Sequence, residues 1–170
     1  MGVSRRESSD EEFDSFALVA WPRLRRTAYL LTGDLHLAED LAQTALVRTY
    51  AKWGRVRRGQ AHAYARTTLV NLNIDRMRRR RIRELPTDEL PDGAVADRTT
   101  TEDADLVIRL LDGLTAQERR VVVLRHYCDL AESTVAHELG ISIGTVKSTC
   151  SRALAKVRVN HPDYVEEELR

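Results

Sequence analysis

The sequence predicts an all-α protein made of two small helical domains that are joined by an acidic linker. Three observations support this fold class. The chain of 170 residues is rich in Ala, Leu, Val, Arg and Glu but contains only 8 glycines and 4 prolines, a composition that favours helices. Apolar residues recur at helical spacing in both halves of the chain. Between these halves lies a stretch with neither a helical nor an alternating apolar pattern.

Charge is strongly segregated along the chain, although the net charge is only +1. Residues 76–83 (RMRRRRIR) are almost all arginine, whereas residues 84–105 hold eight acidic side chains against the single Arg98. A structureless loop of roughly 20 residues is unusual inside one compact domain. We therefore expect an acidic linker over residues 84–102, between one domain over residues 10–83 and another over residues 103–160.

The first domain is predicted to contain three helices. Apolar residues at helical spacing mark the first of them: Phe13, Phe16, Ala17, Ala20, Leu24 and Leu31. Pro22 lies within this pattern and is expected to kink or restart the helix. Asp34 follows a turn and is a suitable cap for a second helix, which should end near Trp53. A basic loop, residues 54–60 (GRVRRGQ), precedes a third helix that begins near Ala61 and enters the arginine-rich segment.

The second domain is predicted to end in a helix-turn-helix. A helix near residues 103–114 comes first, and a capping-box pattern at Thr115 and Glu118 starts the next, which should continue to about Tyr127. Two short helices follow around Gly140, which gives a tight turn the backbone freedom that it needs. We expect the first over residues 132–139, and the second from the cap Ser142 to about residue 157.

The last of these helices has two different faces. On a wheel of about 100° per residue, a buried stripe is formed by Ile143, Val146, Cys150, Leu154 and Val157. The opposite side carries Thr145, Ser148, Thr149, Arg152 and Lys156, and no acidic residue occurs from residue 141 to residue 160. Short hydroxyl side chains and basic groups suit the major groove of duplex DNA. The alternative is an ordinary solvated face, but such a face usually mixes the two signs of charge.

The third helix of the first domain carries a narrow polar strip of Tyr64, Thr68, Asn71, Asp75 and Arg78. An aromatic ring with amide and hydroxyl groups suits unpaired bases, and the following Arg76, Arg79 and Arg80 suit phosphates. The alternative is a polar seam between helices with Asp75 paired to a nearby arginine, and the wheel does not separate the two. On the second helix, an exposed patch of Asp40, Gln43 and Val47 is either a partner site or plain surface.

The sequence gives no sign of an enzyme. The five histidines show no metal-ligand spacing, and there is no Gly-rich phosphate loop or nucleophile elbow. The two cysteines, Cys128 and Cys150, are far apart in the chain and are expected to be reduced thiols. No stretch approaches the roughly 18 apolar residues of a membrane span. We therefore expect no catalytic residues, no metal, no cofactor and no membrane contact, in a cytoplasmic protein.

Four motifs, in this order and at this spacing, resemble those of extracytoplasmic-function (ECF) sigma factors, group IV of the sigma-70 family, in an actinobacterial style. They are AEDLAQTALVRTYAKW (38–53), AYARTTLVNLNIDRMRRRR (63–81), LLDGLTAQERRVVVLRHYCDL (110–130) and ELGISIGTVKSTCSRALAKVR (138–158). The resemblance covers residues 13–158. It implies that the first domain is sigma region 2 and that the second is sigma region 4.

The resemblance also implies a role for each part. Asp40, Gln43 and Val47 would bind the β′ clamp helices of core RNA polymerase. The third helix and its preceding loop would melt and read the promoter −10 element, with Asn71 in the pocket for a flipped-out base. The helix-turn-helix would read the −35 element, chiefly through Lys147, Ser148 and Arg152, while other surfaces of region 4 touch the β flap. The linker would thread the active-site cleft and the RNA exit channel, and an anti-sigma factor is a further partner that the family allows.

This sequence departs from the family pattern at Thr149, where an arginine is common, and at Cys150, where a leucine or histidine is common. These changes bear on the −35 sequence preference and not on the fold. Two other functions fit the helix-turn-helix: a stand-alone transcriptional regulator that binds operators as a dimer, and a sigma mimic that sequesters an anti-sigma factor.

Overall fold

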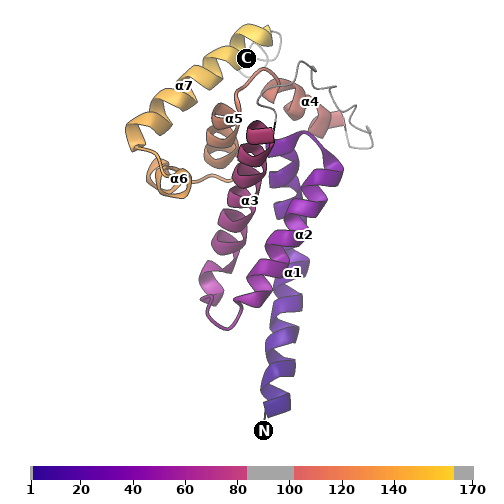
Figure 1. Ribbon diagram of the computed structural model, residues 1–170. Helices are drawn as coiled ribbons and strands as arrows, with labels where there is room; N and C mark the ends of the chain where they lie inside the picture. The colour runs from indigo at the N-terminus through magenta and orange to yellow at the C-terminus, as the bar shows by residue number, and fades with distance from the viewer. Residues whose placement is uncertain (1, 84–101, 163–170) are drawn as a thin grey trace, which may run out of the picture. The chain divides into compact units, whose positions relative to one another are not determined.

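The protein is all-helical throughout the ranges that the computed structural model describes, residues 2–83 and 102–162, as the sequence predicted (Figure 1). The chain divides into two compact units, residues 1–96 and residues 97–170, and each has buried apolar residues of its own. The predicted linker lies outside the described ranges except for Glu102, the first residue of α4. Within those ranges, no helix combines the length and the apolar character that a membrane crossing requires.

Unit 1 is a bundle of three helices that run up, down and up in Figure 1: α1 (Gly2–Thr32), α2 (Leu35–Ala51) and α3 (Ala61–Arg83). A short 3-10 turn, η1 (Arg58–Gln60), leads into α3. Each of the three helices packs against the other two. Their core is rich in alanine and leucine, including Ala20, Leu24, Ala28, Leu31, Ala38, Leu41, Ala42, Ala45, Ala65, Leu69 and Leu72. Because alanine side chains are small, the helices can approach one another closely.

The turn between α1 and α2 follows the predicted chemistry. Gly33 adopts a left-handed backbone with φ of 70°, which is the conformation that commonly ends a helix. Asp34 then caps α2, since its Oδ1 accepts a hydrogen bond of 2.9 Å from the backbone N–H of Leu37. The short connection reverses the chain and places α2 antiparallel to α1 (Figure 1).

The predicted restart at Pro22 is wrong, because α1 continues through this residue as a single helix, and a kink there stays a prediction. Pro22 is exposed, whereas Ala20 and Leu24 on either side of it are buried in the same core. Burial of these flanking residues against α2 and α3 keeps the helix intact despite the backbone hydrogen bond that proline cannot donate. The helix also begins at Gly2, well before Phe13, where the apolar pattern starts.

Unit 2 contains α4 (Glu102–Leu111), α5 (Ala116–Val122), the π-helical turn η2 (Val123–Tyr127), α6 (Glu132–Leu139) and α7 (Ile143–Asn160). Helix α7 packs against both α5 and α6. The core between them is formed by Val121, Val123, Leu124, Val135, Val146 and Ala153. The predicted helix ending near Tyr127 is thus present, with its last turn widened to a π-helix.

The predicted helix-turn-helix is confirmed as a structure. Helix α6 ends at Gly140, whose φ of 64° lies in the left-handed region. Ser142 caps α7 by accepting a hydrogen bond of 3.0 Å from the backbone N–H of Thr145. The capping box at the start of α5 is also present, with Thr115 and Glu118 each bonded to the backbone of the other. These caps fix where α5 and α7 begin.

Candidate nucleic-acid interface

The exposed side of α7 carries most of the residues predicted to meet duplex DNA. Lys147, Ser148 and Arg152 are exposed, and Thr145 is half-buried. The hydroxyl of Ser148 donates to the carbonyl oxygen of Thr145 at 3.3 Å, and Nε of Arg152 donates to the carbonyl oxygen of Ser148 at 3.3 Å. These bonds hold the side chains of Ser148 and Arg152 against the backbone of the preceding turn. The face therefore offers hydroxyl and guanidinium groups, which can bond base edges and phosphates.

Two residues of α7 lie elsewhere than the helical wheel predicted. Thr149 was expected on the DNA-facing side, but its side chain is only 3% exposed. Ile143 was expected on the buried stripe, but it is 46% exposed at the first turn of the helix. Contact with both α5 and α6 places Val146, Thr149 and Ala153 at the centre of the buried face. Cys150 borders this stripe as a half-buried thiol, with its Sγ 3.4 Å from Nε2 of His126.

Two lysines of α7, both predicted to contact DNA, have acidic partners in the unit. Lys147 makes a loose ion pair with Glu132, at 3.7 Å, and its side chain is 64% exposed, so that it can readily exchange this partner for a phosphate. Lys156 is different, because its ammonium lies 2.9 Å from each carboxylate oxygen of the nearly buried Glu118. Lys156 thus anchors α7 to α5 through this ion pair, while its side chain is still 46% exposed and its contact with DNA stays a prediction.

The polar strip on α3, which the helical wheel left open between a surface for unpaired bases and a seam between helices, is largely exposed. Tyr64, Asn71 and Asp75 are exposed and Thr68 is half-buried, with its hydroxyl bonded to the carbonyl oxygen of Tyr64 at 2.8 Å. The carboxylate of Asp75 lies 3.8 Å from the guanidinium of Arg78, which is the local pairing that the alternative interpretation allowed. The strip nevertheless lies at the surface of unit 1, so it is not a seam between its helices.

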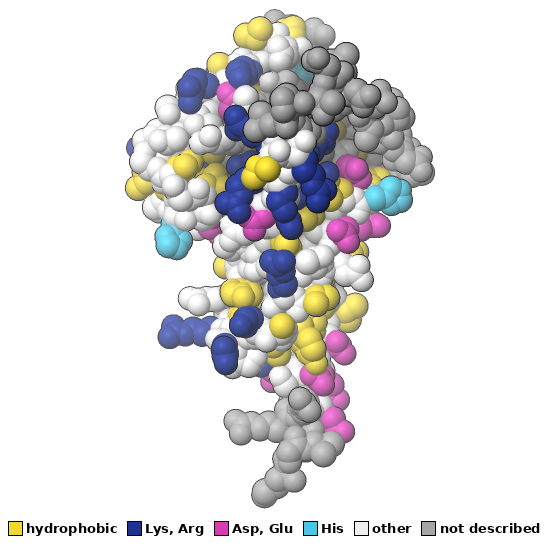
Figure 2. All heavy atoms as spheres, viewed as in Figure 1, with side chains coloured by type: hydrophobic (Ala, Val, Ile, Leu, Met, Phe, Trp, Pro, Cys, Tyr) yellow, Lys and Arg dark blue, Asp and Glu magenta, His cyan; other side chains and the backbone are white. Residues whose placement is uncertain are grey.

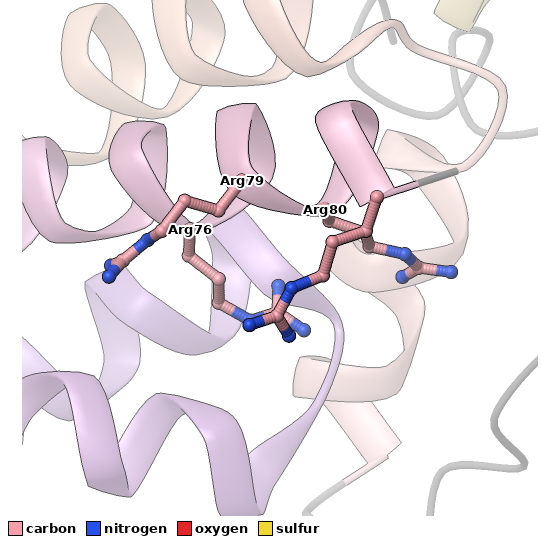
Figure 3. Close-up of a pocket in the computed structure, with 4 residues that line it drawn as sticks. Arg76, Arg79 and Arg80 are labelled. Carbon is pink, nitrogen blue, oxygen red and sulfur yellow. The ribbon is translucent and has the colours of Figure 1, made fainter. Parts of the chain in front are cut away.

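The arginine-rich end of α3 forms a concentrated basic surface. Arg76, Arg79, Arg80 and Arg83 line a hollow of about 460 Å³. Arg76, Arg79 and Arg80 all extend from this part of the helix (Figure 3), and dark blue side chains gather over the same region in Figure 2. Guanidinium groups at this density suit a chain of phosphates.

A second hollow, of about 300 Å³, lies where α2 gives way to the basic loop and α3. It is lined by Lys52, Arg55, Val56, Arg57, Gln60 and Tyr64. Tyr64 is the only one of these residues that was predicted by name to bind DNA, although the resemblance gave the loop as a whole a role at the −10 element. The basic composition of the loop was visible in the sequence, but the folded loop is what brings its cations and an aromatic ring around one space.

The patch predicted on α2 borders an apolar hollow of about 310 Å³ between α1 and α2. Asp40, Gln43 and Val47 are all exposed, and Val47 is 62% exposed although it is apolar. Gln43 and Val47 line the hollow together with Leu46 and Tyr50 of α2 and with Phe13, Ala17 and Trp21 of α1. The contribution of α1 was not predicted, because Phe13 and Ala17 belong to the apolar pattern that was expected to face the core.

Among the described residues, no three His, Cys, Asp or Glu side chains are grouped so that they could hold a metal ion. The chemical character of the described surface lies instead in its basic, hydroxyl and amide groups.

Comparison with known proteins connects both units to one family. Residues 21–82 match the family model for sigma-70 region 2, and residues 110–159 match the model for sigma-70 region 4. The chain is 42% identical over 149 residues to the RNA polymerase sigma-E factor of Streptomyces avermitilis, an alignment that covers 86% of this chain and 83% of that protein. It is 32% identical over 155 residues to the ECF RNA polymerase sigma factor SigL of Mycobacterium tuberculosis, covering 86% and 85% of the two chains.

A solved structure is similar as well. It is the complex of the sigma factor RpoE with the anti-sigma factor NepR from Bartonella quintana, which matches with a TM-score of 0.68 and 27% identity over 87% of this chain and 95% of that chain. The predicted family and function are thus confirmed by the helical fold, by both matched regions and by relatives aligned over most of their length. The chain belongs to the sigma-70 family as an ECF sigma factor, a non-enzymatic subunit that directs RNA polymerase to promoters.

Proposed function

We propose that the two units divide promoter recognition between them. Unit 1 would bind core polymerase and the opened −10 element, and unit 2 would read the −35 element as duplex DNA. The observation that carries this proposal is the difference between their exposed polar faces. The face on unit 1 combines an aromatic ring and an amide with a basic loop, whereas the face on α7 is a helix of short hydroxyl and basic side chains.

The strip on α3 supports a role in binding separated bases. Tyr64 and Asn71 are both exposed on it, and Tyr64 also lines the basic hollow beside Arg55 and Arg57. A base that leaves the duplex loses its stacking and pairing, and a ring, an amide and phosphate contacts can offset this cost. We assign Asn71 to the flipped base, Tyr64, Thr68 and Asp75 to its surroundings, and Arg76, Arg79 and Arg80 to phosphates.

The exposed face of α7 supports duplex recognition in unit 2. Helix α7 is the second helix of the helix-turn-helix, the position that enters the major groove in such motifs. We assign Lys147, Ser148 and Arg152 to the −35 element, with Thr145 beside them. Thr149 is not among these contacts because it is buried.

The apolar hollow between α1 and α2 supports a protein partner. Val47 and Gln43 lie at its edge, and Asp40 adds one exposed acidic group. We propose that this surface binds the β′ clamp helices of core polymerase, that unit 2 contacts the β flap, and that the protein acts in the cytoplasm. An anti-sigma factor is a further proposed partner, because the similar RpoE structure is a complex with one.

Combining a substitution in the protein with substitutions in the promoter tests whether Asn71 reads a base of the −10 element. Holoenzyme carrying the wild-type chain or Asn71→Ala is bound to promoter DNA with the natural or a substituted base at each −10 position, and opening is followed by permanganate reactivity. For the wild type, the substitution at the position that Asn71 reads should cost about 1–3 kcal/mol. For Asn71→Ala, the same substitution should cost much less, while other positions remain discriminated. Equal discrimination by both proteins at every position would contradict the assignment.

A further inference from the structure

The loop between α2 and α3 is tied to the N-terminal part of α1 by Arg58. Its Nε donates a hydrogen bond of 2.9 Å to Oε2 of Glu12, and its Nη2 lies 2.8 Å from the same oxygen. Its Nη1 donates to the carbonyl oxygen of Trp53 at 2.9 Å, and its guanidinium carbon lies 4.1 Å from the centre of the Trp53 ring. One side chain therefore joins α1 to both ends of the basic loop.

Aromatic packing and a second hydrogen bond reinforce the same connection. Trp53 is only 4% exposed, and its ring centre lies 5.1 Å from those of both Phe13 and Phe16 on α1. The hydroxyl of Tyr50, in the last turn of α2, donates to Oδ1 of Asp10 at 2.9 Å. The start of the loop is thus anchored by packing, and its later part by the ion pair of Arg58.

The loop has two faces, one that contacts α1 and one that lines the basic hollow. Trp53 and Arg58 point to α1, whereas the hollow is lined by the residues around them in sequence: Lys52, Arg55, Val56, Arg57 and Gln60. Arg57 and Arg58 are adjacent and equally basic, yet Arg57 lines the hollow and Arg58 is bound to Glu12. The sequence does not distinguish them, but the structure does.

We propose that Glu12 and Arg58 form a clamp that holds the loop in the shape that receives promoter DNA. Arg58 is then a positioning residue and not a phosphate contact. Arg57 is the arginine of this pair that meets DNA. This inference rests on the proposed function of the loop in −10 recognition, and it adds to that function a support on α1 that lies outside the predicted DNA-binding set.

The direction in which Glu12→Gln changes DNA binding and −10 opening distinguishes a clamp from a direct contact between Arg58 and DNA. Glu12→Gln removes a negative charge and releases Arg58. If Arg58 were a DNA contact held back by Glu12, this change would strengthen DNA binding. If the pair is a clamp, the same change loosens the loop and weakens −10 opening. A direct contact therefore predicts that Glu12→Gln strengthens DNA binding, whereas a clamp predicts that it weakens −10 opening.

The experiment uses the full chain assembled with core polymerase. Opening of a promoter duplex is followed by permanganate reactivity, and the salt dependence of DNA binding is measured for Glu12→Gln, Arg58→Ala, Arg57→Ala and the charge-swapped double variant Glu12→Arg/Arg58→Glu. We expect Glu12→Gln and Arg58→Ala each to reduce opening by about two- to fivefold, the range that an exposed ion pair contributes to an equilibrium. Both should keep the wild-type salt slope. The swapped pair restores the ion pair but not the hydrogen bond and ring contact of Arg58 with Trp53, so it should recover opening in part and exceed Arg58→Ala. Arg57→Ala should lower the slope by about one.

Two results would overturn the clamp: opening by Glu12→Gln at or above the wild-type level, or a salt slope that falls by about one in Arg58→Ala. Arg57→Ala and Asn71→Ala reveal which idea has failed. If these two reduce opening while Glu12→Gln does not, only the clamp is wrong. If neither reduces opening, the proposed −10 surface is wrong, and the clamp is wrong with it. Thermal unfolding and core binding are measured for every variant. If a variant loses promoter opening because it no longer folds, the result counts against a positioning role for Glu12 and Arg58.

Discussion

The ammonium of Lys156 lies 2.9 Å from both carboxylate oxygens of Glu118, and this pair joins the last part of α7 to the start of α5. Glu118 also accepts a hydrogen bond of 2.9 Å from the backbone N–H of Thr115, as part of the capping box. One nearly buried carboxylate therefore serves both the start of α5 and the attachment of α7 to it. The orientation of α7 depends on a residue far from its exposed face.

Removing Lys156 should destabilise unit 2. Lys156→Met keeps most of the apolar stem but leaves the buried Glu118 without its charged partner, which should cost about 1–3 kcal/mol. Urea unfolding followed by circular dichroism measures this cost. Both tryptophans of the chain, Trp21 and Trp53, lie in unit 1, so a transition that tryptophan fluorescence does not report belongs to unit 2.

Lys147→Met is the matched control on the same helix. Its ion pair with Glu132 is longer and exposed, so the change should shift stability by no more than about 0.5 kcal/mol. Equal destabilisation by the two substitutions would contradict the anchoring role of Lys156.

The same pair predicts a pH dependence of stability. The hydrogen bond from Lys156, followed by the bond from the Thr115 backbone, lowers the pKa of Glu118 below its ordinary value. A lowered pKa in the folded state gives stability that is complete above the ordinary range of a glutamate, about pH 4, and is lost as the pH falls through that range to the lowered value. Urea titrations between about pH 6 and pH 3 should therefore show a steeper loss for the wild type than for Lys156→Met. Parallel curves would show that the pair is not the cause.

Arg152→Ala should weaken promoter binding and leave polymerase binding intact. If Arg152 meets a phosphate, the slope of log affinity against log salt should fall by about one, and if it meets a base edge, discrimination at one −35 position should relax by about 1–3 kcal/mol. Arg158→Ala is a control of equal charge on the same helix, since Arg158 is exposed on a different side of α7. An equal loss of polymerase binding and promoter binding in pull-down assays would contradict this assignment.

Val47→Asp should abolish the binding of core polymerase. The change places a charge at the edge of the apolar hollow between α1 and α2, where a partner would have to desolvate it. Val159→Asp is the control, because Val159 is 80% exposed on α7 and lies outside the proposed polymerase surface. Binding is measured by size-exclusion chromatography or fluorescence anisotropy with purified core enzyme. If Val47→Asp binds core polymerase with wild-type affinity, Val47 is not part of the interface.

Local signals in the sequence were enough to predict the caps and the turn of the helix-turn-helix. The side chains of Asp34, Thr115 and Ser142 each accept a hydrogen bond from the backbone N–H three residues on, so their neighbours in sequence already determine their role. The polar strip on α3 was found from its helical spacing, but the wheel did not decide between an exposed strip and a seam between helices, and only the folded unit shows that most of the strip is exposed.

Features that depend on distant segments could not be predicted. The partners Glu12 and Arg58 are 46 residues apart, and Glu118 and Lys156 are 38 apart. A wheel assumes one buried side, whereas α7 contacts two helices, and this is why Thr149 was placed on the wrong face. The restart at Pro22 was wrongly allowed for a similar reason, since burial on both sides of it keeps α1 continuous.

Run-off transcription from linear genomic fragments with purified core polymerase tests the division of labour most directly. With the wild-type chain, we predict discrete transcripts whose start sites share a two-part upstream pattern. Arg152→Ala should change the selection at the −35 part alone, and Asn71→Ala the selection at the −10 part alone. Transcripts that depend on only one of these elements, or a protein that binds duplex sites without polymerase and yields no specific transcript, would contradict the account.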